Sequence, residues 1–132
     1  MKAPFYVVLF FALGITGAQQ ISSNQTKEAM RFKLYYAQGI LEGITAENFV
    51  LISTNAFKLK QLSQSADWRV RSSREYQRLT AEYEHATESL GKAARNRNVD
   101  AATVAYFQLT VSCVTCHKYL RGVDVAHFDL VP

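Results

Sequence analysis

The feature that most constrains the fold is a long, regular heptad pattern between Ser72 and Asn96. Apolar residues recur there at steps of three and four, which is the period of one face of an α-helix rather than of a strand. The residues of this seam are Tyr76, Leu79, Tyr83, Ala86, Leu90 and Ala93. Because the remaining positions are mostly polar, the segment predicts an amphipathic helix that buries one side against other helices.

Three other segments show the same period. We expect helices over residues 24–43, 46–62 and 100–121. The predicted seam of the first helix is Met30, Leu34, Ala37, Leu41 and Ile44, and that of the second is Phe49, Ile52, Ala56 and Leu59. Gly43 is expected to end the first helix, Thr45 to cap the second, and Asp100 to cap the fourth.

The composition agrees with an all-α fold. The 132 residues contain 6 glycines and 2 prolines, fewer turn-forming residues than a β-protein of this size needs. Four amphipathic helices joined by short connections must run antiparallel to their neighbours, which predicts an up-down-up-down four-helix bundle. The formal net charge is +4 with the signs interspersed, so no basic stripe of the kind that binds nucleic acid is present.

The first 18 residues have the layout of a secretory signal peptide. Lys2 precedes an apolar run from Phe5 to Ile15, and small residues around Ala18 offer a cleavage site. The apolar run is too short to span a bilayer. We therefore expect an exported, periplasmic protein that does not span the membrane after cleavage, with a single domain over residues 19–132.

The last predicted helix carries a run of three chemically active residues. Cys113, Cys116 and His117 occupy positions i, i+3 and i+4, so a helix presents them on one face. Two thiols at this spacing can add across the vinyl groups of a haem, and the histidine can then bind the iron. Cys-x-x-Cys-His is the attachment signature of c-type haem.

Three other chemistries remain open for these residues. A disulfide between Cys113 and Cys116 is sterically allowed. A thioredoxin-like dithiol would need the start of a helix in a βαβ unit, which the sequence does not predict. A zinc site would need a fourth ligand, for which His85 and His127 are the candidates.

Several segments resemble the class II c-type cytochromes, the cytochrome c′ superfamily. The resemblance lies in "MRFKLYYAQGILEGI" of the first helix, in "KLKQLSQSADW" at the end of the second, and in "CVTCHKYLRG" of the fourth. Leu120 stands where the family has an aromatic residue. The resemblance implies one covalent haem c near the C-terminal end of the fourth helix, redox proteins as partners, and a homodimer through the first two helices.

The resemblance also implies how the haem is held. Cys113 and Cys116 would form the thioether links, His117 would be the proximal iron ligand, and Arg31 and Arg121 are candidate partners of the haem propionates. The distal iron position would take Met30 in a low-spin electron carrier. Alternatively it would stay open behind an apolar cover such as Leu34, in a protein that binds NO or CO.

We expect a one-electron carrier rather than an enzyme. No nucleophile–base pair and no carboxylate pair is set beside the predicted haem site. Met30 is the only methionine beyond the signal peptide. It would lie level with His117 in an antiparallel bundle, although packing in the core is the commoner role of a methionine.

Overall fold

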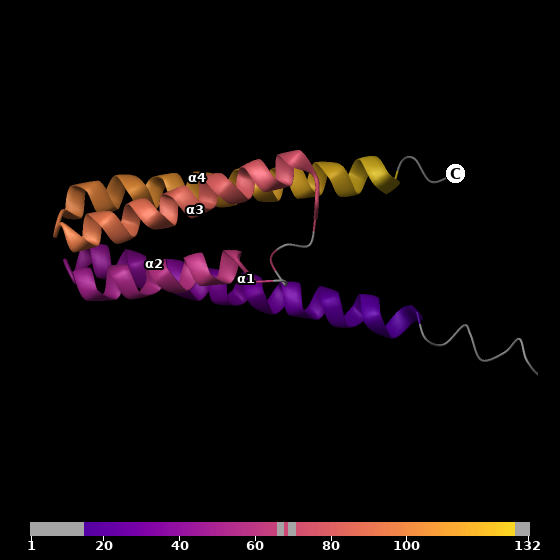
Figure 1. Ribbon diagram of the computed structural model, residues 1–132, viewed down its shortest axis with the longest axis horizontal. Coiled ribbons are helices and arrows are strands. Elements are labelled where there is room, and N and C mark those ends of the chain that lie inside the picture. Colours follow the sequence, from indigo (N-terminus) through magenta and orange to yellow (C-terminus); the bar gives the residue numbers. More distant parts are fainter. Residues whose placement is uncertain (1–14, 66–67, 69–70, 129–132) are drawn as a thin grey trace, which may run out of the picture.

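The computed structural model describes residues 15–65, 68 and 71–128, with side chains for residues 24–65, 68 and 71–122. It contains four α-helices: α1 (Ile15–Thr45), α2 (Phe49–Ser63), α3 (Arg74–Arg95) and α4 (Val99–Phe128) (Figure 1). Most of the predicted signal peptide, residues 1–14, lies outside the described residues. The predicted all-α, up-down four-helix arrangement is confirmed.

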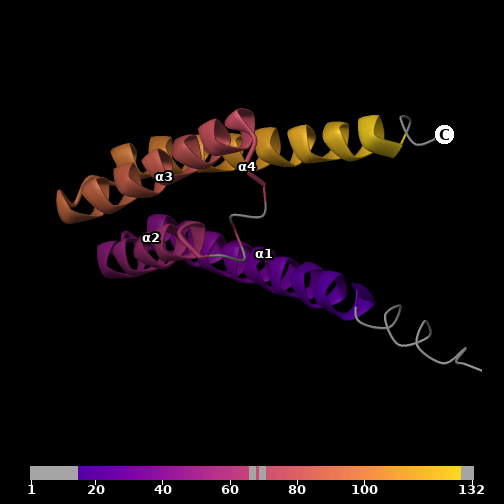
Figure 2. The same ribbon diagram turned by 45° about the vertical axis from the view of Figure 1, so that its right-hand side comes forward.

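The four helices form two helical hairpins that pack on each other. Helix α1 packs on α2, α2 on α3, and α3 on α4, whereas α1 and α4 touch much more sparsely. Both tight turns lie at one end of the bundle (Figure 1). At the other end, the N-terminal part of α1 and the C-terminal part of α4 diverge (Figure 2). The bundle is therefore closed at one end and splayed at the other.

The core follows the predicted seams of α2 and α3. All six predicted seam residues of α3 are buried, because large apolar side chains recur there without interruption. In α2, Ile52, Ala56 and Leu59 are buried and Phe49 packs partly against them. Helix α4 contributes a narrow face of small and medium residues, namely Ala102, Ala105 and Leu109.

The register of α1 differs from the prediction by one position. Its buried residues are Ala29, Lys33, Ile40 and Gly43, whereas Leu34 is 60% and Leu41 46% exposed.

Close packing of α1 against α2 explains this register. A Cβ atom at Gly39 would lie 2.8 Å from Asn55 Nδ2, and one at Gly43 would lie 2.8 Å from Ile52 Cγ1. Because the two glycines let the helix backbones approach, the glycine face of α1 turns inward and the leucine face turns outward.

The two tight turns share one backbone pattern. In each, one residue has a positive φ, Glu47 (49°) and Arg97 (51°), and the next is an asparagine whose side chain caps the following helix. Asn48 Oδ1 accepts the Leu51 N–H at 3.0 Å, and Asn98 Oδ1 accepts the Ala101 N–H at 2.8 Å.

The predicted helix boundaries at these turns were therefore wrong. Gly43 lies inside α1 and does not end it, because the positive φ falls on Glu47. Thr45 and Asp100 do not cap the second and fourth helices, because Asn48 and Asn98 take that role. The N-terminal cap of α3 is Ser73, whose Oγ accepts the Tyr76 N–H at 3.2 Å.

Helix α4 is longer than predicted. It continues through Phe128, so the helix does not end near Arg121. The stretch Val99–Gly122 is long and apolar enough, by length and composition alone, to cross a membrane. The apolar character arises because α4 has a second set of apolar side chains opposite its buried face: Val104, Phe107, Val111 and Val114 are 46–68% exposed.

Candidate functional site

The Cys-x-x-Cys-His residues lie on α4 near the splayed end of the bundle. Cys113 and Cys116 are free thiols, each half-buried, and Cys113 packs against the hydrophobic core. His117 follows them with an exposed side chain. The helical spacing therefore places two thiols and one imidazole together, as the sequence predicted.

Helix α1 presents a buried lysine to the two thiols. Lys33 is 6% exposed, and its ammonium group lies close enough to the Cys113 and Cys116 thiols to interact with them electrostatically. Burial is the main influence on this group and lowers the pKa of Lys33, while the nearby sulfurs of Cys113 and Cys116 oppose the shift. The site thus joins the first hairpin to the second through a basic side chain.

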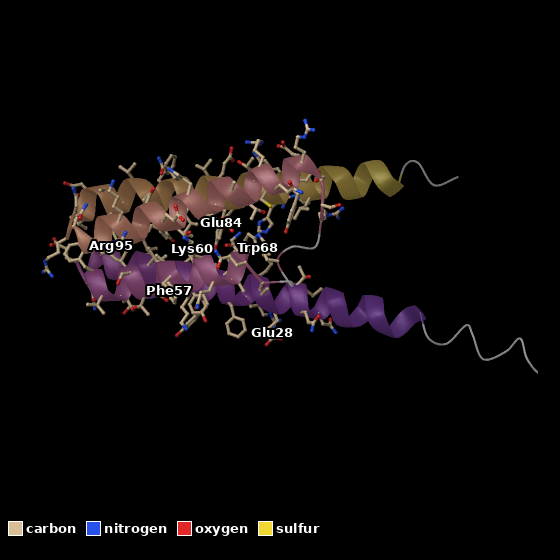
Figure 3. All side chains as sticks on the ribbon, in the orientation of Figure 1. Glu28, Phe57, Lys60, Trp68, Glu84 and Arg95 are labelled. Carbon is tan, nitrogen blue, oxygen red and sulfur yellow. The ribbon has the colours of Figure 1, made fainter. Side chains whose placement is uncertain are left out.

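Two aromatic rings complete the surroundings of this lysine. Lys33 Nζ lies 4.3 Å from the ring centroid of Trp68 and 4.3 Å from that of Tyr83. The two rings contact each other, with centroids 4.8 Å apart. Trp68 lies between the two hairpins (Figure 3). Cation–π contacts of this kind favour the ammonium form and hold Nζ in place.

The indole of Trp68 is anchored from α3. Trp68 Nε1 donates to Thr80 Oγ1 at 3.3 Å, and the Tyr76 hydroxyl donates to the Trp68 carbonyl. Trp68 is 3% exposed although it belongs to the connection between α2 and α3. Trp68 of this connection therefore supplies a wall of the site.

The hydroxyl of Tyr83 has no hydrogen-bond partner. Among the described residues, Tyr83 Oη is the buried side-chain polar atom that lacks one. Burial also raises the pKa of Tyr83 well above its ordinary value, so the phenol stays neutral. A buried, unsatisfied hydroxyl costs free energy, so it marks a place where a polar group of a ligand would be stabilising.

Burial favours the neutral forms of the Cys116 thiol and the His117 imidazole. Burial raises the pKa of the Cys116 thiol, and the charge of Lys33 opposes this shift. Partial burial, followed by the charges of Lys33 and Arg121, lowers the pKa of His117. A neutral imidazole keeps the lone pair that a metal needs.

These residues fit a c-type haem by their chemistry. The two thiols can add to vinyl groups, the neutral imidazole can bind iron, and the unsatisfied Tyr83 hydroxyl can pair with a polar ligand atom. No metal-binding group of three or more His, Cys, Asp or Glu side chains occurs within the described part of the chain. The zinc alternative therefore finds no ligand set there.

The other predicted site residues differ in how deeply they are buried and in how close they lie to the thiols. Met30 is partly buried and packs against the core cluster, so its predicted role as distal ligand stays open. Leu34 is 60% exposed on the outward face of α1, so its predicted role as distal cover stays a prediction. Arg121 lies close enough to influence His117, while the side chain of Arg31 is exposed. His85 is an exposed residue of α3.

Sequence reasoning missed Lys33. Hydrophobic periodicity avoids charged residues, so it selected the leucine face of α1 over the face that carries the lysine and the glycines. The spacing of Ala29, Lys33, Tyr36, Ile40 and Gly43 is itself heptad-like, which is the signal that could have found it.

Comparisons with known proteins return no relative. No protein-family model, no curated protein and no solved structure matches this chain. The chain is thus a four-helix all-α protein in which a buried lysine and two buried aromatic rings lie beside two half-buried thiols, with an exposed imidazole next to them on α4.

Proposed function

We propose that this protein is a monohaem c-type cytochrome that carries single electrons in the periplasm, in partnership with other redox proteins. One observation carries the proposal: two free thiols and a neutral imidazole share one face of a helix that borders a partly polar core. The haem would supply an iron that changes charge by one electron.

The residues of the chain would have distinct tasks. Cys113 and Cys116 would hold the haem covalently, and His117 would bind the iron from the same helix. Arg121, whose charge reaches His117, remains a candidate partner for a propionate. Trp68 and Tyr83 would exclude water from the inner side of the site, since both are almost fully buried.

Attachment of haem can be tested by mass. The full-length chain is expressed in bacteria that carry a c-type haem attachment system, and intact mass and the pyridine haemochrome spectrum are recorded. We expect one covalent haem in the wild type and none in the Cys113→Ser/Cys116→Ser double variant. A wild type that keeps no haem, or whose two cysteines form a disulfide and lose two hydrogens, would refute the proposal.

The role of His117 needs a matched control. His117→Ala should change the visible spectrum of the bound haem, whereas His85→Ala should not, because His85 is exposed on another helix. Equal spectral changes in both variants would contradict the assignment.

Carbon monoxide separates an electron carrier from a gas-binding protein. If the iron has six ligands, the reduced protein should not respond to carbon monoxide, and its spectrum should be low-spin. A high-spin spectrum that shifts with carbon monoxide would instead indicate an open sixth position, the alternative that the cytochrome c′ resemblance implies.

A further inference from the structure

Lys33 is an unusual residue for a protein core. Buried lysines are rare unless a carboxylate pairs with them, because desolvation of the ammonium group is costly. Among the described residues, no carboxylate forms an ion pair with Lys33. Its neighbours are two aromatic rings and two thiols. Cation–π contacts therefore stand where a carboxylate ordinarily compensates for the burial of a lysine.

The place of Nζ limits which part of a bound haem Lys33 can contact. The Cys113 sulfur, whose neighbourhood Nζ shares, would carry the vinyl edge of a haem. The propionates lie on the opposite edge of a porphyrin, so Lys33 is badly placed to pair with them. A primary amine beside the vinyl edge, at the end of a flexible four-carbon chain, can instead reach toward the centre of the ring.

The two helices divide the two faces of such a haem. His117 belongs to α4, the same helix as both attachment residues, and therefore takes one face. The second face must be covered from another element, and Lys33 of α1 is the side chain that reaches the attachment residues from there. We propose that Nζ of Lys33, and not the thioether of Met30, is the sixth ligand of the haem iron, an inference that rests on the proposed function.

Met30 is the weaker candidate for structural reasons. It is partly buried and packs with apolar core residues, which is the ordinary role of a methionine. Lys33 lies one turn further along α1 and is more deeply buried.

The experiment compares three variants of the haem-loaded protein, Lys33→Leu, Lys33→Arg and Met30→Leu. Covalent haem is measured first by pyridine haemochrome, then electron paramagnetic resonance and near-infrared magnetic circular dichroism are recorded on the ferric form. We expect a low-spin wild type with an amine–imidazole signature and no thioether-to-iron band. Both Lys33 variants should become high-spin and bind carbon monoxide when reduced, whereas Met30→Leu should keep the wild-type spectrum.

Several results would overturn the inference. A thioether-to-iron band that Met30→Leu removes would make Met30 the ligand, and a high-spin wild type would leave the sixth position open. If a Lys33 variant does not fold, the near-infrared signature of the wild type still decides between amine and thioether. A wild type without covalent haem would refute the proposed function itself, which haemochrome detects before any ligand is assigned.

Discussion

Gly43 offers a quantitative test of the packing between α1 and α2. Substitution of an internal helical glycine by alanine ordinarily stabilises a helix by about 0.5–1 kcal/mol. At Gly43 the new Cβ would lie 2.8 Å from Ile52 Cγ1, 3.1 Å from the Ile52 nitrogen and 3.2 Å from the Asn48 oxygen. Two of these three atoms belong to the backbone of α2 or its cap, so they cannot move aside without shifting the helix.

The balance of these two effects gives the expected sign. Overpacking of this kind costs about 1–3 kcal/mol, and more when backbone must move. Gly43→Ala should therefore lower the free energy of unfolding by about 1–2 kcal/mol after the gain in helix propensity is subtracted. The φ of Gly43 is not positive, so conformational strain does not contribute.

Gly91 is the matched control. It also lies inside a helix, but its new Cβ would meet only Arg95 Nη1 at 3.4 Å, the end of a flexible side chain. Gly91→Ala should raise the free energy of unfolding by up to about 1 kcal/mol. Urea unfolding followed by circular dichroism, with all proteins in the same haem state, measures both changes. If Gly43→Ala were as stable as Gly91→Ala, the close approach of α1 and α2 would be refuted.

Three further predictions concern caps, pH and surface charge. Asn48→Ala and Asn98→Ala should each lower the free energy of unfolding by about 1 kcal/mol, and unequal urea midpoints would argue against equivalent turns. Burial raises the pKa of Tyr83, so its stabilising contribution is complete below about pH 10 and is lost as the pH rises further. In urea titrations above about pH 10, Tyr83→Phe should therefore lose stability less steeply than the wild type, and parallel curves would exclude this role. Lys60 Nζ and Glu88 Oε1 form an exposed ion pair at 2.5 Å between α2 and α3. Because exposed pairs contribute little to stability, Glu88→Gln should leave the urea midpoint unchanged. A clear decrease in the midpoint that high salt abolishes would contradict this.

The sequence predicted α3 well and α1 poorly, for one physical reason. The seam of α3 consists of tyrosine, leucine and alanine side chains that face the core, and hydrophobic periodicity detects such a pattern directly. The inward face of α1 is defined instead by what Gly39 and Gly43 lack, because absent side chains permit close backbone approach. Periodicity of apolar residues cannot detect an approach of this kind, so it chose Leu34 over Lys33.

The site was predictable in part. The common face of Cys113, Cys116 and His117 follows from helical spacing alone. The position of Lys33 depends on how α1 packs against another hairpin, which no local pattern contains. The haem and its sixth ligand stay predictions that the experiments above test, and the homodimer through α1 and α2 stays a prediction from the family resemblance.

The matching turns imply an order of assembly. Each hairpin has its own asparagine cap, and both caps lie at the same end of the bundle. At that end, the guanidinium carbon of Arg97 in the second hairpin lies 5.0 Å from the ring centroid of Phe49 in the first. Each hairpin depends on contacts that are local in sequence and therefore forms early. The thiols belong to the second hairpin and the lysine to the first, so the two come together only when the hairpins dock. Docking buries Lys33, and this cluster of side chains is therefore completed last in folding.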